Sequence, residues 1–115
     1  MNHSNKTKQL GREKNQRNAL LKSLAVSLVR DGKIQTTETK AKVLRPMVER
    51  LLTKAKAGDL AARRFIGSKL GPVTAKKMVD EIAPKYKERN GGYLRITKLN
   101  NRKSDNATYA QIEFV

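Results

Sequence analysis

A short segment that begins at Arg89 brings together side chains and glycines that suit contact with RNA. Gly91 and Gly92 carry no side chain, so the backbone there can approach a sugar-phosphate closely. Arg89 and Arg95 can each form two hydrogen bonds to phosphate oxygens, and Tyr93 could stack on an unpaired base. In the alternative interpretation, which stays open, the glycines only form a turn and the tyrosine packs across neighbouring strands. Because each residue type is common, the prediction depends on their joint placement.

Other cations extend this predicted RNA-binding surface. Lys98, Arg102 and Lys103 flank or occupy the polar loop between the last two predicted strands, which makes that loop a natural second contact. Arg63 and Arg64 lie in a short predicted helix, where they could also contact phosphates. A plain solvated helix face is a fair alternative for these two arginines, and the sequence does not decide between the two interpretations.

Residues 1–14 form a polar and basic N-terminal arm. Leu10 is nearly the only apolar side chain in it, so burial cannot offset the entropy cost of ordering, and we expect the arm to be disordered without RNA. Such an arm can follow phosphates and fold when it binds, although a tail that only increases solubility is the alternative. The candidate RNA contacts in the arm and at the start of the next helix are His3, Lys6, Lys8, Arg12, Lys14 and Arg17.

The overall charge makes a polyanion the expected partner. Lys and Arg supply 26 of the 115 residues and Asp and Glu only 10, which gives a formal net charge of +16. Compact domains of this size usually carry a net charge of magnitude roughly 2–8, because self-repulsion destabilises the compact state. A phosphate backbone would cancel the excess, so nucleic acid comes first among the candidate partners.

The sequence lacks the constellations that catalysis or metal binding would need. Its single histidine, His3, lies in the arm away from a carboxylate that could orient it, and the chain has no cysteine. A nucleophile–histidine–carboxylate triad and a His/Cys zinc site are therefore not expected. Asp80 and Glu81 are adjacent, so on a helix they point in different directions, and we interpret them as a solvated face. We predict no enzyme activity, no cofactor and no metal site.

The chain also lacks targeting and membrane-spanning signals. No run of about 18 apolar residues occurs, and the polar start has no apolar segment of a secretory signal. We therefore expect a mature cytosolic protein. Binding to a membrane surface is disfavoured as well, because the cations of the first predicted helix gather at its ends rather than along a polar face opposite Trp or Phe.

Hydrophobic spacing predicts the elements that carry these residues. Apolar residues at intervals of three and four predict helices, and alternation predicts strands. The predicted helices cover about residues 15–31, 39–56, 59–66 and 73–83. The predicted strands cover residues 33–37, 93–99 and 107–115.

Particular residues are expected to shape these helices. Gly32 and Gly58 should end the first two helices, and Asp59 should cap the start of the third. Pro46 lies within the second helix, whose apolar stripe continues in phase on both sides, so we predict one kinked helix rather than two. Pro84 should stop the fourth helix. The residues of that helix that we expect to be buried are Val73, Met78, Val79 and Ile82.

These elements predict a single α+β domain over residues 15–115. The last two strands are joined by a polar, basic loop and should form an antiparallel pair. The strand at residues 33–37 should join them, because a lone hairpin is only marginally stable. About four helices would then pack on one face of a small three-stranded sheet, preceded by the basic arm.

Short blocks along the whole chain follow, in order, the pattern of one protein family. The most specific block runs from Arg89 through Tyr93 and continues with Arg95 and Lys98. Other blocks are Ser27-Leu28-Val29, Ile34-Gln35-Thr36-Thr37, Ala55-Lys56-Ala57-Gly58-Asp59-Leu60 and Ile112-Glu113-Phe114-Val115. On these blocks the chain resembles the family of bacterial large-subunit ribosomal protein number seventeen.

The resemblance implies a structural component of the large ribosomal subunit, present as a monomer in the ribosome of the cytoplasm. It implies binding of large-subunit (23S-type) ribosomal RNA near the outer rim of the peptide exit tunnel, contacts with neighbouring large-subunit proteins, and neither catalysis nor a cofactor. The chain departs from the family pattern at Asn2, where arginine is usual, and at Gln16, where histidine is usual. A contact at Gln16 must therefore use an amide.

A free RNA-binding chaperone or regulator, not stably part of the ribosome, is the alternative hypothesis. Such a protein would cofractionate with many RNAs, whereas a ribosomal component would travel with large subunits on a sucrose gradient. The ribosomal hypothesis further predicts that phosphate neutralisation drives binding, so affinity should fall steeply as salt rises.

Overall fold

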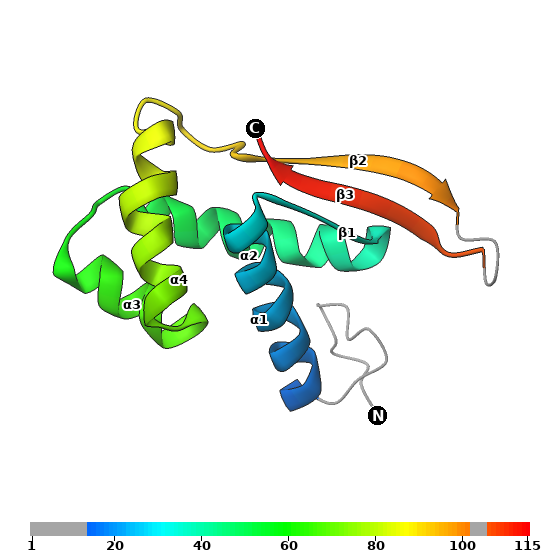
Figure 1. Ribbon diagram of the computed structural model, residues 1–115, viewed down its shortest axis with the longest axis horizontal. Coiled ribbons are helices and arrows are strands. Elements are labelled where there is room, and N and C mark those ends of the chain that lie inside the picture. Colours follow the sequence, from blue (N-terminus) through cyan, green and yellow to red (C-terminus); the bar gives the residue numbers. More distant parts are fainter. Residues whose placement is uncertain (1–13, 102–105) are drawn as a thin grey trace, which may run out of the picture.

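The computed structural model describes residues 14–101 and 106–115. Within these residues, four α-helices accompany a three-stranded antiparallel sheet, and Figure 1 shows the helices gathered on one side of it, which confirms the predicted α+β fold. The predicted disorder of the arm concerns residues that, apart from Lys14, lie outside the described residues. The elements in chain order are α1 (Lys14–Asp31), β1 (Lys33–Thr37), α2 (Glu38–Ala55), α3 (Leu60–Leu70), α4 (Pro72–Lys77), β2 (Leu94–Asn101) and β3 (Thr108–Phe114).

The sheet has the strand order β1–β3–β2, and both strand pairs are antiparallel. The C-terminal strand β3 is therefore central, with Ile112 opposite Ile34 of β1 and Ile96 of β2. As predicted, β1 joins the two C-terminal strands in one sheet. Ala110 and Ile112 are fully buried, because alternate residues of β3 face the helices.

The long helix α2 packs against all three strands and supplies much of the core. Thr37 caps its start, where the side-chain oxygen accepts a hydrogen bond from the backbone N–H of Lys40 at 3.4 Å. The helix continues through Pro46, which is exposed, so one helix forms as predicted. The kink that we expect at this proline stays a prediction. The buried stripe of the helix contains Ala41, Leu44, Val48, Leu51, Leu52 and Ala55.

Gly32 ends α1, as predicted. Its φ of 82° lies in the left-handed region that favours glycine, and its N–H donates to the carbonyl of Leu28 at 2.7 Å. The carbonyl of Gly32 in turn accepts from the N–H of Phe114 at 3.1 Å, which ties the turn to the end of β3. The helix begins at Lys14, one residue before its predicted start, so Lys14 belongs to α1 and not to the arm.

The third helix begins as predicted but extends farther. The side chain of Asp59 accepts a hydrogen bond from the N–H of Ala62 at 2.8 Å and so caps α3. The predicted end at Ile66 is wrong, because Leu70 lies one turn later on the same face and is also buried. Gly71, with a φ of 93°, ends the helix.

The segment from Pro72 to Tyr86 differs from its prediction in two ways. Val73 is 82% exposed rather than buried, because α4 packs against its neighbours through Ala75 on another face. Pro84 does not stop the helical segment: a π-helical turn (Met78–Ile82) leads into a 3₁₀ turn (Ala83–Tyr86) that contains this proline near its start. Proline is tolerated in a first helical turn, where its missing N–H has no partner to lose. The other residues predicted to be buried here, Met78, Val79 and Ile82, are buried.

Candidate nucleic-acid interface

Tyr93 is part of the hydrophobic core. Its side chain is only 1% exposed, and its ring meets the ring of Tyr86 edge to face with 5.6 Å between the ring centres. The hydroxyl accepts hydrogen bonds from Thr53 and from Lys56 Nζ, at 3.5 and 3.1 Å, and these bonds lower the pKa of Tyr93 below its usual value. A ring in this position has no open face for a base, so the structure favours the packing alternative for Tyr93.

The turn before β2 holds Arg89 in place at the surface. Gly91 and Gly92 have φ values of 109° and 64°, so both positions favour glycine and the predicted turn is present. The backbone carbonyl of Arg89 accepts hydrogen bonds from Lys56 Nζ and from the hydroxyl of Tyr93. These contacts fix the backbone of Arg89 while its guanidinium stays exposed, with Nε donating to the carbonyl of Gly91 at 3.3 Å. The buried tyrosine therefore positions an exposed arginine.

Two predicted contacts on β2 are already paired with carboxylates. Arg95 lies opposite Glu113 in the sheet register, and its guanidinium forms an ion pair with that side chain at 3.2 Å. Lys98 Nζ lies 3.4 Å from the carboxylate of Glu38, which Lys42 also approaches at 3.5 Å. Although desolvation acts in the opposite direction, the two lysines hold the pKa of Glu38 below its usual value. Both cations remain exposed, so a phosphate can compete for them.

The two arginines of α3 differ in their surroundings. Arg63 forms an ion pair with Asp80 at 2.6 Å, and this hydrogen bond lowers the pKa of the Asp80 carboxyl. The pair links α3 to the π-helical turn, which gives Arg63 a structural role in addition to its predicted RNA contact. Arg64 is exposed and lines a shallow hollow between α3 and α4 together with Arg63 and Lys76. Asp80 and Glu81 are exposed, as predicted.

The predicted contacts that lie within the described residues do not form one cluster. Lys14 and Arg17 lie at the start of α1, which in Figure 1 is well away from the turn that carries Arg89. Arg63 and Arg64 form a third group on α3. The described cations are therefore spread over several parts of the surface. The predicted contacts outside the described residues are His3, Lys6, Lys8, Arg12, Arg102 and Lys103.

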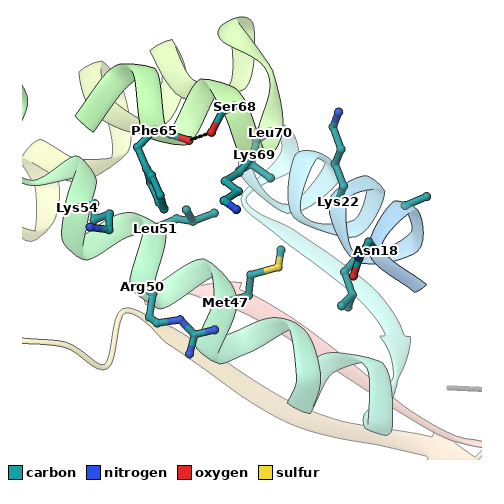
Figure 2. Close-up of a pocket in the computed structure, with 12 residues that line it drawn as sticks. Asn18, Lys22, Met47, Arg50, Leu51, Lys54, Phe65, Ser68, Lys69 and Leu70 are labelled. Carbon is teal, nitrogen blue, oxygen red and sulfur yellow. Dashed lines mark hydrogen bonds between the residues drawn. The ribbon is translucent and has the colours of Figure 1, made fainter. Parts of the chain in front are cut away.

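A further cationic site was not predicted from the sequence. Lys22 of α1, Arg50 and Lys54 of α2, and Lys69 of α3 surround one pocket of about 600 Å³, shown in Figure 2. These residues are far apart in the chain, so no local motif connects them. The one local signal is that Arg50 and Lys54 are one helical turn apart, which places them on the same side of α2.

The described part of the chain contains neither a cluster of metal-ligating side chains nor a membrane-spanning helix. Nowhere in residues 14–101 and 106–115 do three His, Cys, Asp or Glu side chains gather as metal ligands could. None of the helices within those same ranges is both long and apolar enough to cross a bilayer.

Comparison with known proteins identifies the family. The model of the family described as ribosomal protein L17 matches residues 20–115. The chain belongs to this family. A protein of Campylobacter jejuni subsp. jejuni is 51% identical over 116 residues, which cover 100% of this chain and 99% of that protein. A protein of Persephonella marina is 52% identical over 118 residues, which cover 100% of this chain and 95% of that protein. Both are named large ribosomal subunit protein bL17.

Membership of the L17 family confirms the resemblance found in the sequence blocks. The two relatives also match the arm, which the family model leaves out. The L17 family consists of structural ribosomal components, so the membership of this chain in the family supports the prediction that it is not an enzyme.

Proposed function

We propose that this L17-family chain is a structural protein of the large ribosomal subunit that binds and stabilises folded large-subunit ribosomal RNA. The observation that carries this proposal is positive charge that the protein itself leaves without a counter-charge. The described residues contain six ion pairs, and most Lys and Arg side chains in the same part of the chain take part in none of them. RNA phosphates would neutralise these side chains and release bound counterions, which favours binding.

Three groups of described cations supply the proposed phosphate contacts. Three of these cations, Arg63, Arg95 and Lys98, would exchange a partly exposed protein carboxylate for a phosphate. An ion pair at the surface contributes only about 0–1 kcal/mol, so the exchange costs little. The groups are Lys14 and Arg17 on α1, Arg63 and Arg64 on α3, and Arg89, Arg95 and Lys98 around β2. His3, Lys6, Lys8 and Arg12 of the arm and Arg102 and Lys103 of the loop between β2 and β3 complete the proposed set.

The turn before β2 is proposed to approach the RNA backbone directly. Gly91 and Gly92 present no side chain there, and the neighbouring guanidinium of Arg89 is exposed. Tyr93 contributes to RNA binding indirectly, because its buried hydroxyl and Lys56 both donate hydrogen bonds to the carbonyl of Arg89 and so hold the turn in place. We therefore assign Tyr93 a positioning role and not a stacking contact.

The proposed location is the outer rim of the peptide exit tunnel, in the ribosome of the cytoplasm and beside other large-subunit proteins. The name of the relatives, large ribosomal subunit protein, supports the large subunit, and the position at the tunnel rim is what the family resemblance implies. The chain would act there as a monomer and without a cofactor.

Sedimentation tests the proposal. A tagged chain expressed in a bacterium should travel with large subunits on a sucrose gradient at moderate salt. The purified chain should also bind large-subunit RNA fragments with an affinity whose logarithm falls linearly with the logarithm of salt concentration, by about 0.9 for each phosphate contact. Cofractionation with many free RNAs would instead indicate a chaperone, and an affinity that does not change with salt would contradict the mechanism.

A further inference from the structure

The pocket between α1, α2 and α3 has an apolar floor and a cationic rim (Figure 2). Its volume of about 600 Å³ lies within the range of about 300–1,000 Å³ that is typical of ligand sites. No acidic residue lines it within the described part of the chain. The apolar side chains of the floor include Leu21, Met47, Leu51, Phe65 and Leu70. The cations of the rim are Lys22, Arg50, Lys54 and Lys69.

Phe65 is an exposed ring at this pocket. It is 39% exposed, and Lys54 Nζ and Lys69 Nζ lie 4.8 and 5.6 Å from the ring centre. Figure 2 shows the ring directed from α3 toward Leu51 of α2, and the side chain of Lys69 extends toward the same part of the pocket. The ring electrons thus attract two ammonium groups, neither of which forms an ion pair among the described residues. An occupant with both an aromatic surface and a negative charge would complement this arrangement.

Charge disfavours two occupants from the protein itself. A second copy of the chain carries a net charge of +16 and would be repelled by the four rim cations. Residues 1–13 carry Lys6, Lys8 and Arg12 against the single acid Glu13, so the arm is also basic. The occupant must therefore be an anionic partner.

We propose that this pocket binds an unpaired nucleotide of an RNA, whose base stacks on Phe65 while the adjoining phosphates contact the rim cations. The inference rests on the proposed function and adds a specific recognition site to it. The base takes the place of an ammonium group over the ring, and the released ammonium group moves to a phosphate. Base stacking on an aromatic ring is stronger than an exposed cation–π contact, so the exchange is favourable.

Two observations favour RNA over an acidic protein segment. One nucleotide joins a flat aromatic base to a phosphate within a short distance, which matches a phenylalanine ring with ammonium groups 4.8 and 5.6 Å from its centre. The pocket also continues from the start of α1, because Asn18 and Ala19 line it directly after the proposed phosphate contact Arg17. An RNA strand that follows α1 would therefore reach the pocket without leaving the protein surface.

Binding of single-stranded and paired RNA by the full chain tests this inference. The probes are a fluorescent oligoadenosine of about 10 nucleotides and a blunt RNA duplex with no unpaired base. Phe65→Leu keeps an apolar side chain but removes the aromatic surface, so we expect affinity for the single strand to fall by about tenfold. Affinity for the duplex should change by less than about twofold, because duplex binding depends on phosphates.

Two further variants separate stacking from general effects. Phe65→Tyr retains a ring and should bind the single strand as well as the wild type does. Leu60→Ala changes another exposed apolar residue of α3, 61% exposed and outside the pocket lining, and should leave both affinities unchanged. Far-UV circular dichroism should confirm that all variants keep the helix content of the wild type.

The outcomes distinguish this inference from the proposed function. Salt-dependent RNA binding that Phe65→Leu does not alter would overturn the pocket assignment and leave the proposed function standing. Weak and salt-independent binding of a large-subunit RNA fragment by the wild type would overturn the proposed function itself. If an acidic amphipathic peptide displaces the single strand and loses affinity in Phe65→Leu, the pocket belongs to a protein partner and the inference is wrong.

Discussion

Two aromatic residues of this protein occupy opposite surroundings. Tyr93 belongs to the segment with the strongest sequence pattern, yet its side chain is 1% exposed and packs on Tyr86. Phe65 was not among the predicted contacts, yet it is 39% exposed at the edge of a cationic pocket. Stacking on a base needs an open ring face. Tyr93 therefore supports the fold of its segment, whereas Phe65 provides an accessible ring.

The cations beside these rings differ in the same way. Lys56 lies 5.2 Å from the ring centre of Tyr93, but its ammonium group is held by the hydroxyl of Tyr93 and the carbonyl of Arg89. Lys54 and Lys69 lie over Phe65 and form no ion pair within the described residues. A lysine that supports a turn is engaged by its own chain, whereas a lysine at the pocket rim stays available for a phosphate.

Removing the ring of Tyr93 and the ring of Phe65 in separate variants should give the largest difference in stability. Tyr93→Ala is expected to lower the free energy of unfolding by about 3–5 kcal/mol, because it leaves a cavity beside Tyr86. Phe65→Ala should lower it by only about 1 kcal/mol, since the ring is partly exposed. Urea unfolding followed by circular dichroism measures both values. Equal losses in the two variants would break the comparison, and Tyr93→Phe, which keeps the ring, should lose only about 1 kcal/mol.

Deletion of residues 1–13 tests whether the segment before α1 contributes phosphate contacts. The deletion removes Lys6, Lys8 and Arg12, so the slope of log affinity against log salt should fall by about 2–3. The midpoint of thermal unfolding should stay nearly unchanged. Binding to a large-subunit RNA fragment at several salt concentrations measures the slope, and an unaltered affinity would show that the arm makes no contact.

The double variant Arg89→Ala and Arg95→Ala tests the proposed contacts around β2. Both side chains are exposed, so the slope should fall by about 1–2 while the free energy of unfolding changes by less than about 1 kcal/mol. Urea unfolding and the salt series measure the two effects. Arg30→Ala removes a cation paired with the adjacent Asp31 and outside the proposed interface, so it should leave the slope unchanged. A large loss of stability in the double variant would show that these arginines, like Tyr93, mainly stabilise the fold.

The smallest effect concerns the ion pair that joins α3, the helix of Phe65, to the segment after it. Arg63 lowers the pKa of Asp80, so the folded state favours the ionised carboxylate. The resulting stability is present above the usual Asp pKa of about 3.9 and is lost as the pH falls through the lower pKa of the folded state. Asp80→Asn should therefore lower the urea midpoint slightly at pH 7, and the difference should vanish under strongly acidic conditions.

The neighbouring acid offers a control for this pair. Glu81 is exposed and forms no ion pair among the residues that the structure describes. Glu81→Gln should leave the urea midpoint at pH 7 as in the wild type. A pH dependence that Asp80→Asn does not alter would show that the ion pair contributes nothing to stability.

Local patterns predicted the elements well where the chain carries clear end signals. Gly32 and the cap residue Asp59 act where expected, because a left-handed φ and a side-chain cap depend on the residue itself. The end of α3 and the burial of Val73 were predicted wrongly. Both depend on which surface of a short helix meets the rest of the protein, and Leu70 or Ala75 is buried only because other elements pack there.

The candidate interface was predictable only in part. The turn at Gly91 and Gly92 follows from residue type, but the burial of Tyr93 depends on Tyr86 and on the lysine that reaches it from α2. The pocket combines side chains from three helices, so spacing along the chain could not reveal it. A weak signal exists in Phe65, which falls outside the buried stripe of α3 and is one of only two phenylalanines.

The amino-acid sequence alone determines the excess of positive charge, the absence of cysteine, the order of helices and strands, and the glycine turn, because these follow from residue type and local spacing. Only the tertiary structure decides which ring is accessible and which cations already have a carboxylate. Arg63 meets Asp80, and Lys98 meets the carboxylate of α2, across separate elements of the fold. Exposure and ion pairing depend on how closely residues far apart in the chain approach one another, and packing sets those distances.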